Sequence, residues 1–400
     1  MVPNGWEVKS LSSITKWSSG GTPSKNNPDY WNGDIPWISA ASMRGHYFEK
    51  SELRITDLAV SNGAKMAPKD SLLLLVRGSM LWNKIPVGIT AKKVSFNQDV
   101  KCLVPHADEL TTEFLLYWFL TYEHRLMNMV TGTGIGAGKL DTTDLQSLDV
   151  FLPPLPEQRK IAKILSTWDK AITTAEKLIE TSKQQKKALM QQLLTGKKRL
   201  VNPETGKAFE GEWNSQPISS LITESRIAGT NGELARKLTV KLYGRGVTQK
   251  EEKRLGSSST KYYKRKSGQF IYSKLDFLNG AFGIIPEHLD GFESTLDLPA
   301  FDFSEQVEPK WFIEFVSRDD FYTSNLGLAN GGRKARRVNP KDLLQIKVQV
   351  PSLKEQQKIA SVLTAADNEI EVHEVKLAHF KQEKKALMQQ LLTGKKRVVI

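Results

Sequence analysis

Residues 186–199 and residues 384–397 read the same fourteen letters, KKALMQQLLTGKKR. The offset between the copies is 198 (384 − 186 = 198), and it continues without a gap back to Pro153 and Pro351. An ungapped correspondence of this length indicates internal duplication, with a period far longer than that of a solenoid repeat. The sequence therefore predicts one whole module used twice. Such a pseudo-twofold object suits a target with two half-sites.

The chain is basic, with a formal net charge of +13 and a pI of about 9.5 over 400 residues. This charge favours a nucleic acid or another anionic surface as partner, although a merely basic surface stays open as the alternative. Cys102 is the sole cysteine, which excludes an intrachain disulfide or a cysteine-based zinc site and fits a reducing compartment. Without an apolar run of membrane-spanning length or a signal-peptide pattern, we expect a cytoplasmic protein with no membrane association.

Apolar residues recur in steps of four and three through both copies, from Ile161 to Leu193 and from Ile359 to Leu391. This is the pattern of a coiled coil. We expect a first helix over residues 157–195, 39 residues or about 58 Å at ~1.5 Å per residue. Prolines precede each stripe, and Gly196 or Gly394 follows it as a C-cap. Two equal stripes most simply pack antiparallel on each other. The alternative is that each helix packs on its own domain or on a partner chain.

The regions before the helices correspond more faintly. Trp6 matches Trp213 at an offset of 207, and the segment 87–89 (VGI) resembles 282–284 (FGI). Asp141 and Asn339 are both predicted to be the N-cap of a short helix, and each short helix leads into an apolar strand. Residues 72–76 and 270–272 are predicted to be strands. The predicted fold class is mixed α/β, with two α/β domains joined by two long antiparallel coiled-coil helices in pseudo-twofold symmetry. The predicted organisation is a first domain at 1–152, a long helix at 153–200, a turn-rich linker at 201–212, a second domain at 213–350 and a second long helix at 351–400.

Glycine and cations combine in one loop of each half. Residues 131–139 read TGTGIGAGK, which imitates nucleotide-binding motifs but lacks the first P-loop glycine and the final Ser or Thr. The matching residues 330–337 read NGGRKARR. A glycine-rich basic loop in both halves favours close approach of the backbone to DNA phosphates, and an ordinary surface loop is the alternative. Aromatic residues also alternate with cations at 261–266 (KYYKRK), beside Tyr30 and near Trp82.

Catalytic patterns are missing from the sequence. Pro153-Pro154 follows Phe151-Leu152, so the Asn- or Asp-Pro-Pro-aromatic motif of amino methylation is absent. Residues 383–385 spell the ExK of a nuclease, but in the middle of a predicted helix. The six histidines have no metal-ligand spacing, and His373 falls in the helical stripe as a packed or partner-facing residue.

The whole chain resembles the specificity subunit of type I restriction–modification enzymes. The motifs that carry the resemblance are the GGTPS loop at 20–24 with YW at 30–31 and PW at 36–37, the joints LPPLPEQ (152–158) and VPSLKEQ (350–356), the paired long helices, and the LLTGKK endings at 193–198 and 391–396. The second half lacks a GGTPS-like loop, so residues cannot be carried over from one half to the other one by one.

The resemblance implies two target-recognition domains, each reading one part of a bipartite, gapped double-stranded DNA target. It implies that the long helices hold the domains apart and dock two methyltransferase (modification) subunits, which bind S-adenosylmethionine and methylate adenine. Restriction/translocase subunits would join them and use ATP and Mg. The chain itself would bind no cofactor and no metal and would be no enzyme. Two rival classes stay open: an enzyme acting directly on DNA, and a basic coiled-coil scaffold that binds nucleic acid without sequence preference.

Candidate contact residues follow from these patterns. For the first half the candidate DNA-binding residues are Gly20, Gly21, Thr22, Lys25, Tyr30, Arg77, Lys84, Lys92, Lys93 and Lys139. For the second half they are Arg245, Lys261, Tyr262, Lys264, Arg265, Lys274, Arg333, Lys334, Arg336 and Arg337. The candidate partner-binding residues are Glu157, Gln158, Trp168, Glu355, Gln356 and His373.

Overall fold

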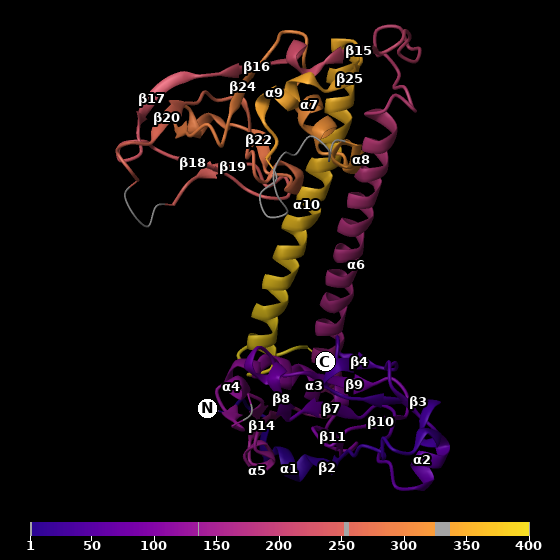
Figure 1. The fold of residues 1–400 in the computed structure, drawn as a ribbon. Helices are drawn as coiled ribbons and strands as arrows, with labels where there is room; N and C mark the ends of the chain where they lie inside the picture. The colour runs from indigo at the N-terminus through magenta and orange to yellow at the C-terminus, as the bar shows by residue number, and fades with distance from the viewer. Residues whose placement is uncertain (1, 135, 252–255, 325–336, 400) are drawn as a thin grey trace. The chain divides into compact units, whose positions relative to one another are not determined.

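The computed structural model describes residues 2–134, 136–251, 256–324 and 337–399. The chain divides into two compact units. Unit 1 comprises Met1–Glu176 with Val375–Ile400, and unit 2 comprises Lys177–Glu374. Each unit therefore contains one globular region and one half of each long helix, labelled α6 and α10 in Figure 1.

The two long helices, α6 (Leu155–Leu193) and α10 (Leu353–Leu391), are each 39 residues long and pack together. Within unit 1, Asp169 and Glu176 of α6 form ion pairs with Lys384 and Lys381 of α10. The partner number falls as the α6 number rises, so the helices are antiparallel. The same order holds within unit 2, where Lys183 pairs with Glu374 and Lys186 with Asp367. The predicted antiparallel pairing is confirmed.

The helix ends differ from the prediction by two residues. Helix α6 begins at Leu155 because proline is tolerated in the first turn, where its missing N–H has no helical partner. It ends at Leu193, before Gly196, which adopts a φ of 71°. Gly394 has a φ of 68° at the equivalent place after α10. The predicted apolar stripe is the face that packs, and Ile161, Leu165, Ile359 and Leu363 are almost fully buried.

Unit 1 is built on a five-stranded sheet of order β2-β11-β7-β9-β4, and a second sheet has the order β5-β3-β10-β6. All four residues of β7 are buried, as expected for a central strand covered on both faces. Helix α3 packs on β7 and β9. The strands are β1 (Glu7–Ser10), β2 (Thr15–Ser19), β3 (Trp31–Ile38), β4 (Tyr47–Phe48), β5 (Arg54–Ile55), β6 (Met66–Ala67), β7 (Leu72–Leu75), β8 (Arg77–Gly78), β9 (Val87–Thr90), β10 (Val94–Phe96), β11 (Val100–Pro105), β12 (Thr131–Gly132), β13 (Gly138–Lys139) and β14 (Asp149–Leu152). The helices are α1 (Leu11–Ile14), α2 (Asp57–Ser61), α3 (Thr112–Thr121), α4 (Glu123–Met127) and α5 (Thr142–Gln146), with 3₁₀ turns at Pro28–Tyr30, Ala40–Ser42 and Ser79–Trp82.

Unit 2 has a four-stranded sheet of order β16-β24-β21-β22, which repeats the order β2-β11-β7-β9 of unit 1. Its core is aromatic, with Phe270 packing on Tyr272, Phe301 and Phe312. The strands are β15 (Asn214–Pro217), β16 (Ile222–Ser225), β17 (Ile227–Asn231), β18 (Leu238–Val240), β19 (Val247–Gln249), β20 (Lys261–Lys264), β21 (Phe270–Tyr272), β22 (Phe282–Ile284), β23 (Glu293–Ser294), β24 (Ala300–Phe303) and β25 (Lys347–Val350). The helices are α7 (Pro309–Val316), α8 (Asp319–Ser324) and α9 (Pro340–Gln345), with 3₁₀ turns at Ile218–Ser220, Phe277–Asn279 and Glu287–Leu289.

The duplication reaches into the globular regions at the same offset of 198. Two backbone hydrogen bonds at the end of β7 have counterparts 198 residues later at the end of β21. The pairs are Val76 N–H to Asp99 O (2.8 Å) with Lys274 N–H to Asp297 O (3.0 Å), and Leu140 N–H to Val76 O (2.9 Å) with Val338 N–H to Lys274 O (2.9 Å). The two globular regions therefore share a backbone scaffold, although their amino-acid sequences correspond only faintly. The mixed α/β class and the internal symmetry are confirmed.

Smaller expectations also hold. Asp141 caps α5, accepting a hydrogen bond from Thr143 N, and Asn339 precedes α9 without a side-chain cap bond. Residues 202–206 form a turn closed by Gly206 N–H to Asn202 O. In the part of the chain that the structure describes, no helix is both long and apolar enough to cross a membrane.

Candidate nucleic-acid interface

One end of the unit 1 sheet gathers several of the predicted DNA-binding residues. Ser19 at the end of β2 pairs with Lys101 of β11, and Val100 pairs with Leu75 at the end of β7. Strand β9 begins beside that end of β7, because Val87 pairs with Leu74. The loop at 20–25, Arg77 and Lys84 therefore leave the sheet at the same end. The strands that lead into the loop and into Arg77, β2 and β7, are two strand spacings apart, about 10 Å.

Two tryptophans hold the loop at 20–25. The Trp37 indole donates to Gly21 O (3.0 Å), and the Trp31 indole donates to Ser24 O (3.1 Å). Gly20 is required for packing, because a Cβ there would lie 2.2 Å from the carbonyl oxygens of Phe96 and Asn97. Within the loop, Thr22 and Lys25 are exposed, whereas Tyr30 is half-buried against the small cluster that contains Trp37.

The glycine-rich segment at 131–139 is a β-hairpin of β12 and β13 that adds β8 as a third strand. Lys139 lies directly opposite Arg77 across this sheet. The Trp82 indole, 48% exposed, donates to Gly136 O (3.1 Å) and fastens the hairpin tip. A hairpin is neither the strand-to-helix turn of a dinucleotide site nor a P-loop. It brings two exposed cations and an exposed aromatic ring together.

Asp141 lies beside this cluster. Its carboxylate accepts from Thr143 N and approaches Lys139 Nζ at 3.4 Å, and these two contacts, in that order, lower the pKa of Asp141. The lysine and aspartate side chains are each about half exposed, so the pair leaves much of the Lys139 charge available.

Lys92 and Lys93 lie elsewhere. They follow β9, whose end lies beside the beginning of β7, as the hydrogen bond from Thr90 N–H to Ser71 O shows. Arg77 follows the opposite end of β7. The structure therefore does not bring these lysines to the cluster of Arg77 and Lys139.

In unit 2, three predicted cations gather at the equivalent end of the sheet. Lys274 follows β21, and Arg337, the counterpart of Lys139 at offset 198, precedes the residue that bonds to Lys274 O. Arg245 lies in the hairpin of β18 and β19, whose tip bonds to Asn279 O and Gly280 O in the turn after Lys274. Arg333, Lys334 and Arg336 lie outside the described residues.

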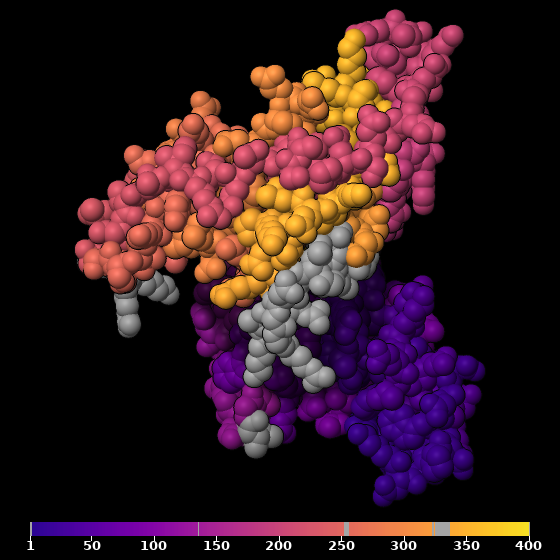
Figure 2. Space-filling view, turned by 45° about the horizontal axis from the view of Figure 1, so that its top comes forward, coloured from indigo at the N-terminus to yellow at the C-terminus, as the bar shows by residue number. Residues whose placement is uncertain are grey.

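Lys261, Tyr262 and Lys264 form a second surface of unit 2. They belong to β20, the middle strand of the sheet β17-β20-β23, and the two lysines are exposed. Strand β20 leads through a turn to the beginning of β21, whereas Lys274 follows the end of β21. In Figure 2 the residues of β17 to β20, coloured salmon, lie at the surface of unit 2.

The prediction for Arg265 is wrong. Its side chain is 1% exposed and donates to Ser294 Oγ (2.8 Å), Ser225 O (2.7 Å) and Leu298 O (3.2 Å). Burial lowers the pKa of Arg265 to about 10, so the guanidinium remains charged at neutral pH. With its donors committed to the protein interior, Arg265 is not available to a DNA phosphate.

Four of the predicted partner-binding residues are likewise buried, which corrects their assignment. Glu157 and Glu355 each receive two hydrogen bonds from an arginine and one from a tryptophan indole, and Gln158 and Gln356 each join a helix start to a preceding loop. The Glu157 contacts are Arg397 Nε and Nη2 (both 2.6 Å) and Trp6 Nε1 (3.1 Å), and the Glu355 contacts are Arg199 Nε (2.6 Å), Arg199 Nη2 (2.8 Å) and Trp213 Nε1 (3.2 Å). The glutamines bond to Thr111 N, Glu109 O and Pro153 O, or to Glu308 N, Gln306 O and Pro351 O.

We call each buried glutamate with its arginine and tryptophan partners a clamp. In each clamp the arginine comes from the repeat that does not contain the glutamate. In unit 1 the arginine, Arg397, comes from the end of the second repeat, and in unit 2 the arginine, Arg199, comes from the end of the first. Of the other predicted partner residues, Trp168 is half-buried against Phe380 in unit 1, with ring centroids 5.7 Å apart. The His373 side chain is 23% exposed, with Nε2 3.7 Å from Glu369 Oε1.

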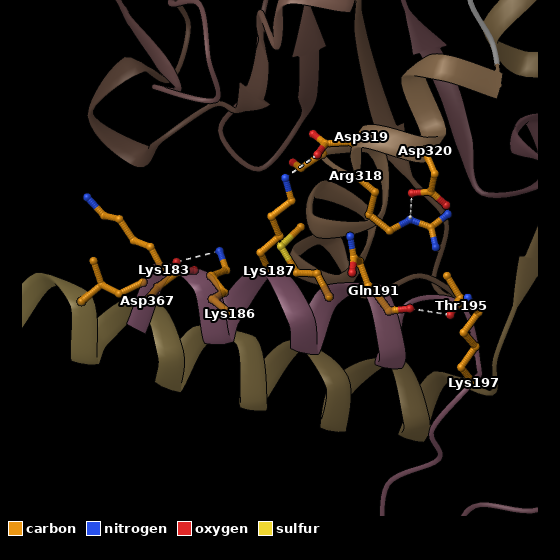
Figure 3. A pocket seen from close by; sticks show the side chains of 13 residues that line it. Lys183, Lys186, Lys187, Gln191, Thr195, Lys197, Arg318, Asp319, Asp320 and Asp367 are labelled. Carbon is orange, nitrogen blue, oxygen red and sulfur yellow. Dashed lines mark hydrogen bonds and ion pairs between the residues drawn. The ribbon is translucent and has the colours of Figure 1, made fainter. Parts of the chain in front are cut away.

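A groove of about 790 Å³ lies in unit 2 between α6, α8 and α10 (Figure 3). Its charged side chains pair across the groove, with Lys187 Nζ 2.6 Å from Asp319 Oδ2 and Lys186 Nζ 2.7 Å from Asp367 Oδ1. Burial would raise the pKa of Asp367, but hydrogen bonds from Lys186 and Lys310 outweigh it, and the net pKa is lowered. Among the described residues, no group of three or more His, Cys, Asp or Glu side chains could hold a metal ion. The groove is lined by ion pairs and by the apolar stems of lysine side chains.

Two candidate residues were missed by sequence reasoning. The sequence pattern places Trp82 beside Lys84 and near Arg77, but it does not show that the Trp82 ring joins the hairpin to the cation cluster. Tyr243 is 75% exposed with a φ of 60° at the tip of the β18–β19 hairpin. Its sequence signal is the pattern YGRG at 243–246, in which glycines flank an arginine beside an aromatic residue.

Comparisons with known proteins agree with this layout. A family profile described as "Type I restriction modification DNA specificity domain" matches residues 3–183 and 320–381, more than half of the chain. The EcoR124I/EcoR124II specificity subunit of Escherichia coli is 33% identical over 165 residues, which is 41% of this chain and 41% of that subunit. The chain thus matches less than half the length of that relative. A putative MjaX specificity subunit of Methanocaldococcus jannaschii is 26% identical over 99% of this chain and 95% of its own.

A solved structure has the same fold. The S subunit of a type I restriction–modification system from M. genitalium superimposes with a TM-score of 0.57 at 17% identity. The match covers 98% of this chain and 99% of that one. At this identity the likeness concerns the fold.

Proposed function

Because the chain belongs to the type I restriction–modification DNA specificity family, we propose that it is the sequence-reading subunit of such a complex, with one half-site of a gapped DNA target for each unit. The observation that carries the proposal is the repeated scaffold. The equivalent strands β7 of unit 1 and β21 of unit 2 each end near an exposed cation. These cations, Lys139 and Arg337, occupy equivalent positions in the two repeats. Two copies of one reader in one chain suit two half-sites rather than one continuous site.

The proposed contacts divide into two kinds. Exposed lysines and arginines at the strand ends neutralise phosphates and supply most of the affinity, which then falls with salt. Base edges are read by the loops that differ between the units, and each good bidentate contact contributes about 1–3 kcal/mol of discrimination. The basic charge of the chain, +13, agrees with this division.

We propose that the helix pair sets the unread spacer, since rigid elements between two readers fix half-site separation. The pair also offers exposed apolar side chains to partners, including Leu178 and Val372 in unit 2 and Val375 in unit 1. Two methyltransferase subunits would dock on this surface and carry S-adenosylmethionine, and restriction/translocase subunits would carry ATP and Mg. In this proposal the chain contributes recognition and assembly, and no catalysis.

The test is selection from random duplex DNA by the chain co-purified with its methyltransferase partner, followed by sequencing. Two short motifs with a fixed, unread gap are expected. Enrichment of one continuous motif would contradict the division of reading between two units. DNA binding without enrichment and with a steep salt slope would favour the scaffold. Turnover of DNA by the purified chain alone would favour an enzyme.

A matched pair of variants strengthens this test. Lys139→Ala removes a charge at the proposed interface. Lys50→Ala removes an 88% exposed charge that follows β4, beside the end of β9 that lies away from Arg77. The first variant should weaken DNA binding and lower its salt slope by about 1, because one phosphate contact is lost, and the second should leave both unchanged.

A further inference from the structure

The two units share their scaffold but not the elements attached to it. Unit 1 carries the sheet β5-β3-β10-β6 and the tryptophan-held loop at 20–25, whereas unit 2 carries the separate two-stranded ribbon β18–β19. The backbone common to both units cannot by itself make them prefer different bases. If the units read different half-sites, as the proposed function requires, the preference comes from the side chains and attached elements that differ between them. In unit 2 the attached elements are the sheet β17-β20-β23 and the ribbon, and the tip of the ribbon bonds to the turn that follows β21 and Lys274.

The tip of the ribbon is fixed by backbone bonds. Lys241 N–H donates to Gly246 O (2.9 Å) and closes the turn. Tyr243 N–H donates to Asn279 O and Gly244 N–H to Gly280 O, both at 2.8 Å. Gly280 allows this approach, because a Cβ there would lie 3.2 Å from Tyr243 Cα. The tip is therefore seated on the turn that follows β21, the strand end where Lys274 and Arg337 gather.

Tyr243 has an unfavourable backbone conformation at this tip. Its φ of 60° is rare for a bulky residue, and residues held in this way cluster at functional sites. The ring gains no packing in return, since the residue is 75% exposed, and the neighbouring Leu242 is 38% exposed. An aromatic side chain that is both strained and presented to solvent is expected where another molecule covers it.

Arg245 stands two residues further along the same tip and is exposed. Within the described residues no carboxylate forms an ion pair with it, so its planar fork of donors is available. The major groove of B-DNA admits a two-stranded ribbon, and arginine binds the O6 and N7 atoms of guanine there with two hydrogen bonds. Aromatic rings pack on thymine methyl groups and on bases.

We propose that the tip of the β18–β19 ribbon enters the major groove and determines the half-site of unit 2. Arg245 reads a guanine, and Tyr243 packs beside it on the neighbouring base. The shared cations at the strand end hold the phosphates and position the ribbon. This inference rests on the proposed function and adds to it the residues that read bases in one unit.

The experiment repeats the selection with the complex carrying Tyr243→Gly, Arg245→Ala or no change. Glycine accepts a φ of 60°, so Tyr243→Gly removes the ring without imposing a new backbone conformation. Thermal unfolding of each variant checks that the fold is retained. The expected result is loss of preference at one or two positions of one half-motif, with the other half-motif and the gap unchanged. For Arg245→Ala the preference for a guanine should fall about 5- to 150-fold.

The outcomes separate this inference from the proposed function. If the unchanged complex selects a bipartite motif and folded variants select the same motif in both halves, the ribbon is not the reader and the proposed function stands. Equal weakening of binding to all sequences would assign Arg245 to phosphates and also overturn the inference. If the unchanged complex selects no bipartite motif, both are overturned together.

Discussion

Removal of the Glu355 carboxylate should destabilise unit 2 far more than removal of an exposed carboxylate. Glu355 is 1% exposed and receives hydrogen bonds from Arg199 at 2.6 and 2.8 Å and from the Trp213 indole at 3.2 Å. Breaking a buried pair by removing one partner costs about 3–5 kcal/mol. Arg199 is about a quarter exposed and keeps its bond to Gly211 O (2.8 Å), which places Glu355→Ala at the lower limit, about 3 kcal/mol.

The matched control is Glu204→Ala. Glu204 forms an ion pair with Lys354 at 2.7 Å, but both side chains are at least 60% exposed, and such pairs contribute about 0–1 kcal/mol. For a unit of 198 residues (374 − 177 + 1), about 3 kcal/mol corresponds to a fall of roughly 6–12 °C in Tm, and the control to a few degrees at most.

The assay is thermal unfolding of the full chain, with hydrogen exchange of peptides around Trp213 and β25 to locate the effect. Exchange there should accelerate strongly in Glu355→Ala and stay unchanged in Glu204→Ala. Glu157→Ala should produce the same effect around Trp6 in unit 1, since its contacts are equivalent. Equal Tm shifts for Glu355→Ala and Glu204→Ala would refute the reasoning, because the burial of Glu355 would then add nothing to the stability that its carboxylate contributes.

Three further predictions concern single side chains. Arg265→Ala should lower the stability of unit 2 by about 3 kcal/mol, because the buried Ser294 Oγ and Ser225 O lose the guanidinium as donor. Denaturant unfolding measures this, and unchanged stability would contradict the buried role of Arg265. Asp367 has a lowered pKa when folded, so its stabilising effect is present above about pH 4 and is lost as the pH falls through the folded pKa. The Tm should therefore fall less steeply between pH 6 and pH 3 in Asp367→Asn than in the unchanged chain. Parallel curves of Tm against pH would contradict this. Arg337→Ala should lower the salt slope of DNA binding by about 1, as Lys139→Ala does, and an unchanged slope would exclude Arg337 from the phosphate contacts.

The long helices could be predicted almost completely from the sequence. The apolar period and the flanking prolines and glycines act locally, and the duplicated stripe gave both helices at once. The ends were misplaced by two residues because proline fits a first turn as well as it blocks an extension. The equivalence of the two sheets was only partly visible, since it rests on backbone bonds such as those of Val76 and Lys274, which different side chains can share.

The candidate site was less accessible to sequence reasoning. The local sequence does not show whether a cation next to aromatic residues is exposed or buried. Lys264 is exposed, whereas the neighbouring Arg265 is buried. The duplicated Glu-Gln pairs at the start of each helix were candidate partner-binding residues. They are internal instead, because their partners, Arg397 and Arg199, arrive from the opposite repeat, and no local pattern shows that exchange.

The central claim is that two units read DNA at a separation set by the helix pair. One heptad inserted into α6 after Glu176 and one into α10 after Glu374 keep the stripe in phase and lengthen the pair by about 10 Å, at ~1.5 Å per residue. Selection from random duplex DNA by this variant complex measures both half-motifs and the gap. The account predicts unchanged half-motifs and a gap longer by about three base pairs, at ~3.4 Å per base pair. An unchanged gap with both half-motifs retained would contradict it.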